Sequence, residues 1–158
     1  MNADRQRTAL FAGSFDPFTI GHEAIVRRGL EIFDHIIIGI GYNENKHGTW
    51  TPDERLEAIR GLYSGEPRVN VELYTGLTVD YAVKSGARFL LRGIRGAIDF
   101  EYERNLADIN RAISGIETVI LISEPDMAIV SSSMVRELLH NGYDISRYVA
   151  GNFIIKSK

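Results

Sequence analysis

The 158-residue sequence contains no cysteine. Disulfide bonds, thiolate nucleophiles and cysteine-based metal sites are therefore excluded, and nothing points to an oxidising compartment. Long apolar runs are also missing, since the longest, around Ile36–Ile38, is far too short to cross a bilayer. No apolar segment follows the polar first residues, so we expect no secretory signal, no membrane partner and a cytoplasmic location.

Neither sign of charge dominates, because 18 Lys and Arg stand against 21 Asp and Glu, for a net charge of −3. This balance argues against a nucleic-acid partner or an anionic-membrane binder. A chain of this length can bury roughly two-thirds of its unfolded surface. No linker, repeat or charge block interrupts the chain. We therefore expect a single domain over residues 1–158, with residues 1–7 flexible and residues 144–158 forming a short helix and a tail.

Apolar residues follow two alternating periods along the chain. Short strand-like runs are separated by segments in which apolar residues recur at helical spacing, as between Tyr102 and Ile113. This alternation predicts repeated βαβ units and hence an α/β fold, a doubly wound parallel five-stranded sheet with helices on both faces. The predicted strands are Thr8–Gly13, His35–Tyr42, Val69–Tyr74, Arg88–Gly93 and Glu117–Ser123.

Local signals mark where several helices begin and end. The sequence predicts a capping box, with proline at the first helical position, at Thr51-Pro52-Asp53-Glu54. Gly86 and Gly142 stand where helices are expected to stop. In a fold of this kind, ligands bind beyond the carboxyl ends of the strands.

The first predicted strand leads into the segment Gly13–His22 (GSFDPFTIGH), where a helix should begin. We expect Gly13 to let the chain turn sharply, and Gly21 to leave the helix N–H groups uncovered beside His22. A polar, helix-capping loop is the simpler interpretation. A hydroxyl, two glycines and a histidine at the expected ligand position nevertheless favour phosphate binding. No P-loop, dinucleotide fingerprint, zinc-protease or serine-hydrolase motif competes with this interpretation.

Arg92 and Arg95 end the fourth predicted strand (RGIRG) and suit a polyanion, because guanidinium groups form forked hydrogen bonds to phosphate. The acidic residues that follow (DFEYE) are partly explained by the helix dipole. The helix dipole is the better explanation for Asp99. For Glu103, the helix dipole and a ligand role are equally supported.

Ser131–Ser133 precede a further predicted helix, with Arg136 about one turn inside it. One serine would serve as an ordinary N-cap. Three hydroxyls, free helix N–H groups and an arginine also make a second phosphate-sized cradle. Lys46, in the loop after the second predicted strand, adds a flexible positive charge near the same face.

Together these motifs resemble bacterial phosphopantetheine adenylyltransferases, within the nucleotidyltransferase superfamily. Thr19–His22 matches that superfamily's (H/T)-x-G-H motif, and Ser131–Arg136 resembles its second motif, I-S-S-(S/T)-x-x-R. The RGIR segment followed by DFEYE is the more specific part. The sequence departs from the family pattern at Ala12 (usually Pro), at Ser14 (usually Thr) and at Met127–Ile129, where an aromatic residue and a serine are common.

The resemblance implies a Rossmann-like nucleotidyltransferase fold and a reversible reaction of coenzyme A biosynthesis. The adenylyl group of ATP would pass to 4′-phosphopantetheine, giving dephospho-coenzyme A and pyrophosphate. Mg²⁺ would accompany ATP without a dedicated protein site, and coenzyme A would be a feedback inhibitor. The chain would form a homohexamer, for which the apolar tail Phe153–Ile155 is suited.

The resemblance also implies roles for individual residues. The catalytic residues would be His22 and Lys46. The phosphopantetheine-binding residues would be Ser14, Lys46, Thr78 and Arg92. The ATP-binding residues would be Ser14, Phe15, His22, Gly93, Ile94, Arg95, Glu103, Met127, Ala128, Ile129, Val130, Ser131, Ser132 and Ser133.

The absence of an obvious base fits this chemistry. A phosphate monoester is already ionised near neutral pH, so catalysis would consist of aligning two phosphates and stabilising charge, without a covalent intermediate. Two alternatives stay open: transfer of AMP or CMP to a different phosphate acceptor, and a nucleotide-sensing module without turnover. Arg92 with DFEYE argues against the first, and the presence of both Lys46 and His22 argues against the second.

Overall fold

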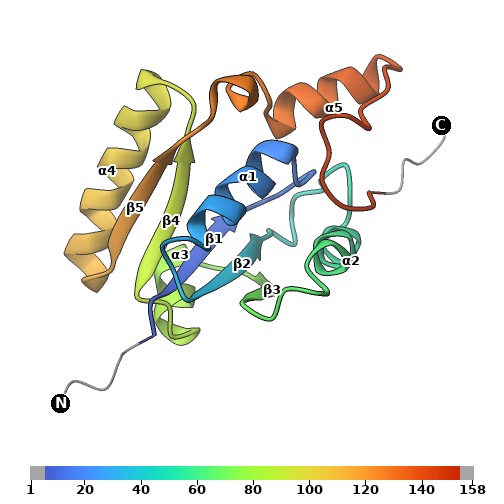
Figure 1. The fold of residues 1–158 in the computed structure, drawn as a ribbon. Helices are drawn as coiled ribbons and strands as arrows, with labels where there is room; N and C mark the ends of the chain where they lie inside the picture. Colours follow the sequence, from blue (N-terminus) through green and yellow to red (C-terminus); the bar gives the residue numbers. More distant parts are fainter. Residues whose placement is uncertain (1–5, 154–158) are drawn as a thin grey trace.

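The computed structural model describes residues 6–153, which form one five-stranded parallel sheet in the order β3-β2-β1-β4-β5 (Figure 1). The predicted doubly wound sheet is confirmed. The strands are β1 (Thr8–Gly13), β2 (His35–Gly41), β3 (Val69–Tyr74), β4 (Phe89–Ile94) and β5 (Glu117–Ile122). The helices are α1 (Ile20–Gly29), α2 (Pro52–Leu62), α3 (Thr78–Lys84), α4 (Ala97–Ser114), the short 3₁₀ helix η1 (Pro125–Met127) and α5 (Ser132–His140).

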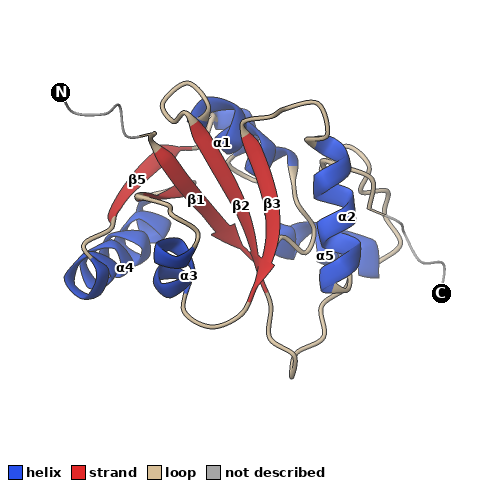
Figure 2. Cartoon of the chain, turned by 90° about the horizontal axis from the view of Figure 1, so that it is seen from below, coloured by secondary structure: helices blue, strands red, loops and turns tan. Residues whose placement is uncertain are grey.

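Helices cover both faces of the sheet. Helices α1, α2 and α5 lie on one face, and α3 and α4 lie on the other (Figure 2). Successive side chains of a strand point to opposite faces. Phe11 of β1 accordingly packs in the cluster with α1, α2 and α5, whereas its neighbours Leu10 and Ala12 pack with α3. This is why the strands read as continuous apolar runs.

The predicted helix boundaries are confirmed where a local signal fixes them. The Thr51 hydroxyl accepts from the Glu54 N–H at 3.2 Å, and the Glu54 carboxylate accepts from the Thr51 N–H at 2.8 Å, which makes a capping box. Gly86 and Gly142 follow α3 and α5 with φ of +79° and +81°, a conformation that favours glycine.

The expected C-terminal helix is absent from residues 144–153, which form turns. The backbone of this segment pairs with the loop before α1 instead. Val149 makes an antiparallel bridge with Thr19, and the Ala150 N–H donates to the Phe18 carbonyl at 3.0 Å. A helix here would use those backbone groups for its own hydrogen bonds, so the segment is not helical and instead braces the loop that carries the T-x-G-H motif.

The first and last described residues are held more closely than the sequence suggests. Phe153, expected to need burial in an assembly, is buried against Trp50, with 5.3 Å between the ring centroids. Ile154 and Ile155 lie outside the described residues. In the segment expected to be flexible, the Arg7 N–H donates to the Asp34 carboxylate at 2.7 Å. Residues 1–5 lie outside the described residues.

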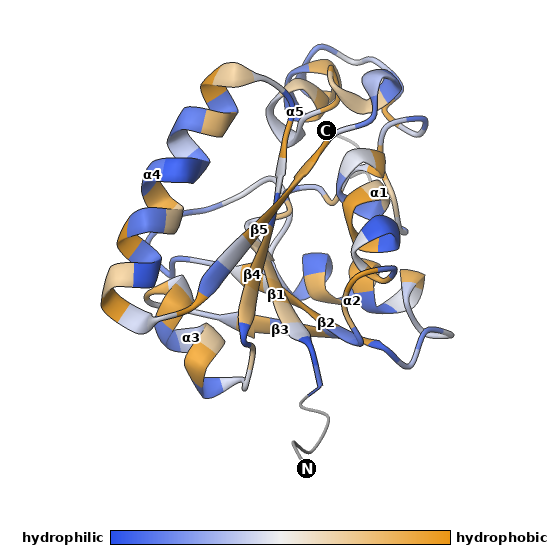
Figure 3. Ribbon diagram, turned by 60° about the vertical axis from the view of Figure 1, so that its left-hand side comes forward, coloured by the Kyte–Doolittle hydropathy of each residue, from blue (hydrophilic) through white to orange (hydrophobic). Residues whose placement is uncertain are grey.

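Helix α4 differs from its expected packing. The periodic apolar residues of this segment predict a core-facing helix, yet the one buried residue of α4 is Glu103. Ile98, Ile109 and Ile113 remain 87%, 57% and 62% exposed. Figure 3 shows hydrophobic segments along α4, which lies beside the β4–β5 side of the sheet. Periodicity identified an amphipathic helix correctly but could not tell that this chain leaves the apolar side uncovered. Within residues 6–153, no helix has both the length and the apolar character needed to cross a membrane.

Candidate functional site

Two cavities open at the carboxyl end of the sheet, where the α/β architecture predicts ligands. The first, of about 710 Å³, lies between the ends of β1 and β4 and the beginnings of α1 and α5, and His22 and Arg95 line it. The second, of about 630 Å³, lies beside the loop that carries Lys46. Ser14 lines both cavities, so a ligand that crosses from one to the other passes this residue.

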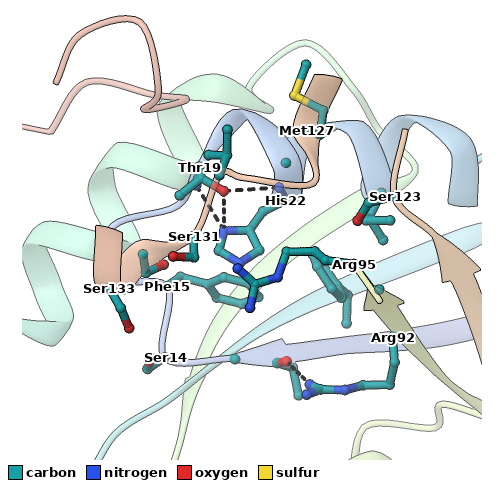
Figure 4. Close-up of a pocket in the computed structure, with 18 of the residues that line it drawn as sticks. Ser14, Phe15, Thr19, His22, Arg92, Arg95, Ser123, Met127, Ser131 and Ser133 are labelled. Atoms are coloured by element: carbon teal, nitrogen blue, oxygen red, sulfur yellow. Dashed lines mark hydrogen bonds between the residues drawn. The ribbon is translucent and has the colours of Figure 1, made fainter. Parts of the chain in front are cut away.

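His22 is fixed by the cap of its own helix. Thr19 is the N-cap of α1, and its hydroxyl accepts from the His22 N–H at 3.3 Å. In return, the Thr19 backbone N–H donates to His22 Nδ1 at 2.9 Å. A backbone N–H can only donate, so Nδ1 is the acceptor and the neutral ring carries its proton on Nε2. Figure 4 shows the opposite edge of the ring facing Arg95.

The surroundings of His22 keep the imidazole neutral. Burial, and to a smaller extent the positive charges of Arg92 and Arg95, together lower the pKa of His22 to about 4. Phe15 and Phe18 flank the ring, with centroids 5.0 and 5.3 Å from that of His22. His22 therefore offers a neutral N–H donor to the first cavity.

The turn after β1 departs from expectation in its details. Gly13 does not take a positive φ; the left-handed residue is Phe15, with φ of +48°. A Cβ on Gly13 would lie 3.0 Å from the Phe15 ring, so Gly13 makes room for that ring. A Cβ on Gly21 would lie 3.5 Å from the Thr19 hydroxyl oxygen, and Gly21 lines the first cavity. The glycine at position 21 thus leaves space for a ligand near the helix N-terminus.

Arg92 joins the first cavity to α4. Its Nε and Nη2 donate to the two Glu103 carboxylate oxygens at 2.9 and 2.7 Å, and its Nη1 donates to the Ala12 carbonyl at 2.6 Å. Burial alone would lower the pKa of Arg92, but the hydrogen bonds and charge of Glu103 outweigh burial and raise it. Arg92 is therefore a fixed cation. Glu103 holds the side chain of Arg92 and is not among the residues that line the first cavity.

Arg95 is more loosely held. Its side chain is 43% exposed, and Nε donates to Asp99 at 3.2 Å in an ion pair one turn into α4. Such an exposed pair is weak and easily exchanged for a ligand. The expected ATP-binding residues that line this cavity are Ser14, Phe15, His22, Gly93, Arg95, Met127, Val130, Ser131, Ser132 and Ser133. Ile94, Glu103, Ala128 and Ile129 are not among its lining residues.

Each of the three serines already has a partner in the protein. Ser131 is the N-cap of α5 and accepts from the Met134 N–H at 3.1 Å. Ser132 donates to the Pro17 carbonyl at 2.8 Å, and Ser133 accepts from Arg136 Nη2 at 3.3 Å. The cradle predicted from the sequence therefore also fastens α5 to the loop before α1.

Two buried charges connect the Ser14 loop with the Lys46 loop. Asp16 accepts from the N–H groups of Thr49 and Trp50 at 2.8 and 2.9 Å. Arg55 Nη1 donates to the Ser14 carbonyl at 2.7 Å, and its Nε donates to the Trp50 carbonyl at 3.0 Å. Because both loops share these bonds, Ser14 and the Lys46 segment are positioned together.

Thr78 lies in a third cavity, of about 410 Å³, between α3, α4 and the end of β4. Arg92 lines this cavity as well as the first, and so does Tyr102. The Tyr74 hydroxyl is 2.8 Å from the Thr78 hydroxyl, and Tyr74 lines the second cavity. Of the residues expected to hold phosphopantetheine, Ser14 lines the first and second cavities and Arg92 the first and third, whereas Lys46 lines the second and Thr78 the third.

Several lining or supporting residues were not among those chosen from the sequence: Asp16, Arg55, Tyr74, Tyr102 and Ser123. Tyr102 was counted with an apolar helix face, yet it is 62% exposed. Arg55, within α2, is 4% exposed. An arginine among the apolar residues of a predicted helix is a signal that could have indicated this buried position.

Comparison with known proteins places this site in a family. Residues 10–138 match a family model described as cytidylyltransferase-like. The chain is 52% identical over 143 residues to a phosphopantetheine adenylyltransferase of Bacteroides thetaiotaomicron, covering 90% of this chain and 95% of that protein. It is 48% identical over 151 residues to a phosphopantetheine adenylyltransferase of Porphyromonas gingivalis, covering 96% and 99%.

Among solved structures, the fold resembles a bifunctional NMN adenylyltransferase/ADP ribose pyrophosphatase from Francisella tularensis, complexed with AMP and a manganese ion. The TM-score is 0.70 at 14% identity, over 93% of this chain and 45% of that one, so the chain spans less than half of that protein. At this identity the likeness concerns the fold alone. Matches at about half identity over nearly the whole length decide the family: this chain belongs to the phosphopantetheine adenylyltransferases, within the cytidylyltransferase-like group.

Proposed function

We propose that this protein transfers the adenylyl group of ATP to 4′-phosphopantetheine, releasing pyrophosphate and forming dephospho-coenzyme A. The observation that carries the proposal is the orientation of His22: its Nδ1 accepts from Thr19, so its Nε2–H is the donor left for the first cavity. The positive charges of Arg92 and Arg95 act on the His22 ring. Two cationic hydrogen-bond donors and one neutral donor therefore lie around the same small volume. Such convergence suits an anion.

The chemistry needs charge stabilisation more than proton transfer. A phosphate oxygen of phosphopantetheine attacks the α-phosphorus of ATP, and the bond from that phosphorus to the bridging oxygen of pyrophosphate breaks. The attacking monoester is already ionised, so no base is required. Charge that develops on the α-phosphoryl oxygens is met by His22 Nε2–H, a donor already oriented by its helix cap. The reverse reaction uses the same contacts.

The acceptor fits along the three cavities, because Ser14 lines both the first and the second, and Arg92 lines both the first and the third. Lys46 and Arg92 supply positive charge for its phosphate, with Ser14 between them. The pantetheine arm extends into the third cavity past Thr78, where Leu77 and other apolar side chains of α3 and α4 form the walls. An arm of amides and methylene groups suits such a mixed surface.

The nucleotide fits the first cavity. Gly21 and the α1 N-terminus leave space and N–H groups for phosphate, and Arg95 can exchange Asp99 for the triphosphate. Phe15, Gly93, Met127 and Ser131–Ser133 complete the wall. Ile94, Ala128 and Ile129, which do not line this cavity, are adjacent in the chain to residues that do.

Mg²⁺ enters with ATP in this proposal. Within the described part of the chain, no group of three or more histidine or acidic side chains is placed to hold an ion by itself. The triphosphate would therefore supply most of the metal's ligands, and the ion would neutralise phosphate charge.

We further propose a cytoplasmic single-domain enzyme that assembles as a homohexamer and is inhibited by coenzyme A. The uncovered apolar side chains of α4 favour self-association, because Ile98, Ile109 and Ile113 would lose contact with water. Coenzyme A shares the pantetheine arm and the adenine with the ligands, so it competes at the same site. Light scattering at micromolar concentration should show a hexamer, and a monomer would contradict this assembly.

Pyrophosphate release from ATP and Mg²⁺ tests the main proposal. Release should require phosphopantetheine and should be matched by dephospho-coenzyme A. Release with another phosphate acceptor, but not with phosphopantetheine, would indicate a different transferase. ATP binding without release under any of these conditions would indicate a nucleotide-sensing module.

A further inference from the structure

Two hydroxyl groups connect the second cavity with the third. The hydroxyl oxygens of Tyr74 and Thr78 lie 2.8 Å apart. Tyr74 lines the second cavity, which also contains Lys46, and Thr78 lines the third. Within residues 6–153 neither hydroxyl has another hydrogen-bond partner. One of the two hydroxyls therefore donates to the other, and the proton of the second is left for a ligand.

The direction of this hydrogen bond follows from the chemistry of the two groups. A phenol is more acidic than an aliphatic alcohol, so the phenol is the stronger donor and the alcohol is the better acceptor. Tyr74 therefore donates to Thr78, and the O–H of Thr78 is the donor that remains. Thr78 lies between Leu77 and Val79 in the wall that α3 contributes to the third cavity, where it supplies the polar group. A ligand carbonyl is a suitable partner for such a donor.

The ring of Tyr74 is held in place on the sheet. It stacks on Tyr81, with ring centroids 4.6 Å apart and an interplanar angle of 7°. The Tyr81 hydroxyl in turn donates to the Glu72 carboxylate. A Cβ on Gly41 would lie 3.0 Å from the Tyr74 hydroxyl oxygen, and a Cβ on Gly39 would lie 3.2 Å from the ring. The two glycines of β2 therefore leave the room in which the Tyr74 ring lies.

We propose that Tyr74 is a positioning residue for the arm of the acceptor. By donating to Thr78, Tyr74 orients the Thr78 hydroxyl so that its proton meets an amide carbonyl of the arm in the third cavity. The inference rests on the proposed function, which supplies an acceptor whose arm contains amides. A donor that is oriented before the ligand arrives loses less entropy on binding than a freely rotating hydroxyl. The hydroxyl pair therefore favours an arm with an amide carbonyl over a purely hydrocarbon arm.

Removing the Tyr74 hydroxyl tests this role. Tyr74→Phe keeps the ring and its stack on Tyr81, so it should raise the KM for phosphopantetheine about fivefold, with kcat and the KM for ATP within about twofold. The matched control is Tyr63→Phe, at a partly buried tyrosine that lines none of the three cavities, which should leave both KM values unchanged. An unchanged KM for phosphopantetheine in Tyr74→Phe, or an equal rise in both KM values, would overturn the proposal.

A double-mutant cycle tests whether Tyr74 acts through Thr78. Thr78→Val removes the second hydroxyl with little change of shape and should weaken phosphopantetheine binding, measured by calorimetry, about fivefold or more. Adding Tyr74→Phe to Thr78→Val should change the affinity less than about twofold. Adding it to Thr78→Ser, which keeps the hydroxyl, should still weaken binding about fivefold. Equal effects of Tyr74→Phe in the wild-type chain and in Thr78→Val would overturn the positioning role.

A measurement without substrates separates this inference from the proposed function. When tyrosine carries ¹³C at Cζ, a hydroxyl that exchanges slowly gives two NMR signals in an equal mixture of H₂O and D₂O. Tyr74, identified by comparison with Tyr74→Phe, should give two signals in the wild-type chain and one in Thr78→Val. Far-UV circular dichroism would show that each variant is folded. The same pattern for Tyr74 in both chains would overturn the positioning role alone. A wild-type chain with two signals, but without adenylyl transfer, would overturn the proposed function alone.

Discussion

Thr19 and His22 cap the same helix turn from both sides. The Thr19 hydroxyl accepts from the His22 N–H at 3.3 Å, and His22 Nδ1 accepts from the Thr19 N–H at 2.9 Å. In an ordinary capping box a glutamate or glutamine makes the second bond. With histidine in that position, the bond that closes the helix end also determines which ring nitrogen carries the proton. The same local motif therefore stabilises the start of α1 and fixes the proton of His22 on Nε2.

Replacing Thr19 should separate these two roles. Thr19→Val keeps the backbone N–H bond to Nδ1 and removes the side-chain cap, so the free energy of unfolding should fall by about 1 kcal/mol. Since the tautomer of His22 is retained, kcat should fall only a few fold. Thr19→Ser, which keeps the hydroxyl, is the control for urea denaturation and kinetics. A larger loss in Thr19→Ser than in Thr19→Val would mean that the methyl packing of buried Thr19 matters more than the cap.

The lowered pKa of His22 predicts how stability depends on pH. The pKa is about 4 in the folded chain, against 6.5 for an unperturbed histidine. Between these values the unfolded chain binds a proton that the folded chain does not, so the free energy of unfolding falls as pH drops from about 6.5 to about 4. NMR should show neutral His22 with its proton on Nε2 at pH 5.5. His22→Asn should flatten this part of the stability curve. A measured pKa near 6.5 would contradict the described environment.

Arg55 should matter for both folding and activity. Arg55→Met leaves the carbonyls of Ser14 and Trp50 without their partner, which should lower the free energy of unfolding by about 2 kcal/mol or more. The Ser14 and Lys46 loops would loosen together, so KM should rise for both substrates. Arg60→Met is a matched control on the same helix, where the lost bond is one donor to the Val71 carbonyl. Similar effects of the two substitutions would refute a specific role for Arg55.

Ser14 stands where the family usually has threonine, and substitutions at this position test which part of the side chain matters for activity. The residue is exposed and lines two cavities, so Ser14→Thr adds a methyl without displacing core atoms and should change activity modestly. Ser14→Ala removes a hydroxyl aimed at phosphate and should reduce kcat/KM about tenfold. Steady-state kinetics of both variants decides the matter, since equal losses would show that the hydroxyl is not the important group.

Much of the fold could be predicted because its signals are local. All five strands were placed within about one residue at each end, and the capping box at Thr51 and the stop at Gly86 follow from short-range chemistry. Segments that depend on other parts of the chain were predicted less well. The backbone of residues 144–153 pairs with the loop at Thr19, and periodicity in α4 cannot show which partner its apolar side meets.

The same distinction applies to the site. His22, Arg92 and the serines at the start of α5 could be predicted because they stand in short motifs at strand ends or helix starts. Arg55 was missed because it acts on Ser14 from 41 residues away in the sequence. The pairing of Arg92 with Glu103 could not be seen either, since it depends on how the beginning of α4 returns to the end of β4.

Steady-state kinetics of His22→Ala, combined with calorimetry, tests the central claim most directly. If the Nε2–H of His22 meets charge that appears only as the α-phosphorus is attacked, kcat should fall roughly a hundredfold or more, with substrate affinities largely intact. Lys46→Ala should show a smaller loss of kcat with weaker phosphopantetheine binding, because its ammonium mainly neutralises the incoming phosphate. Loss of ATP binding in His22→Ala, with kcat unchanged at saturation, would contradict the catalytic role given to His22.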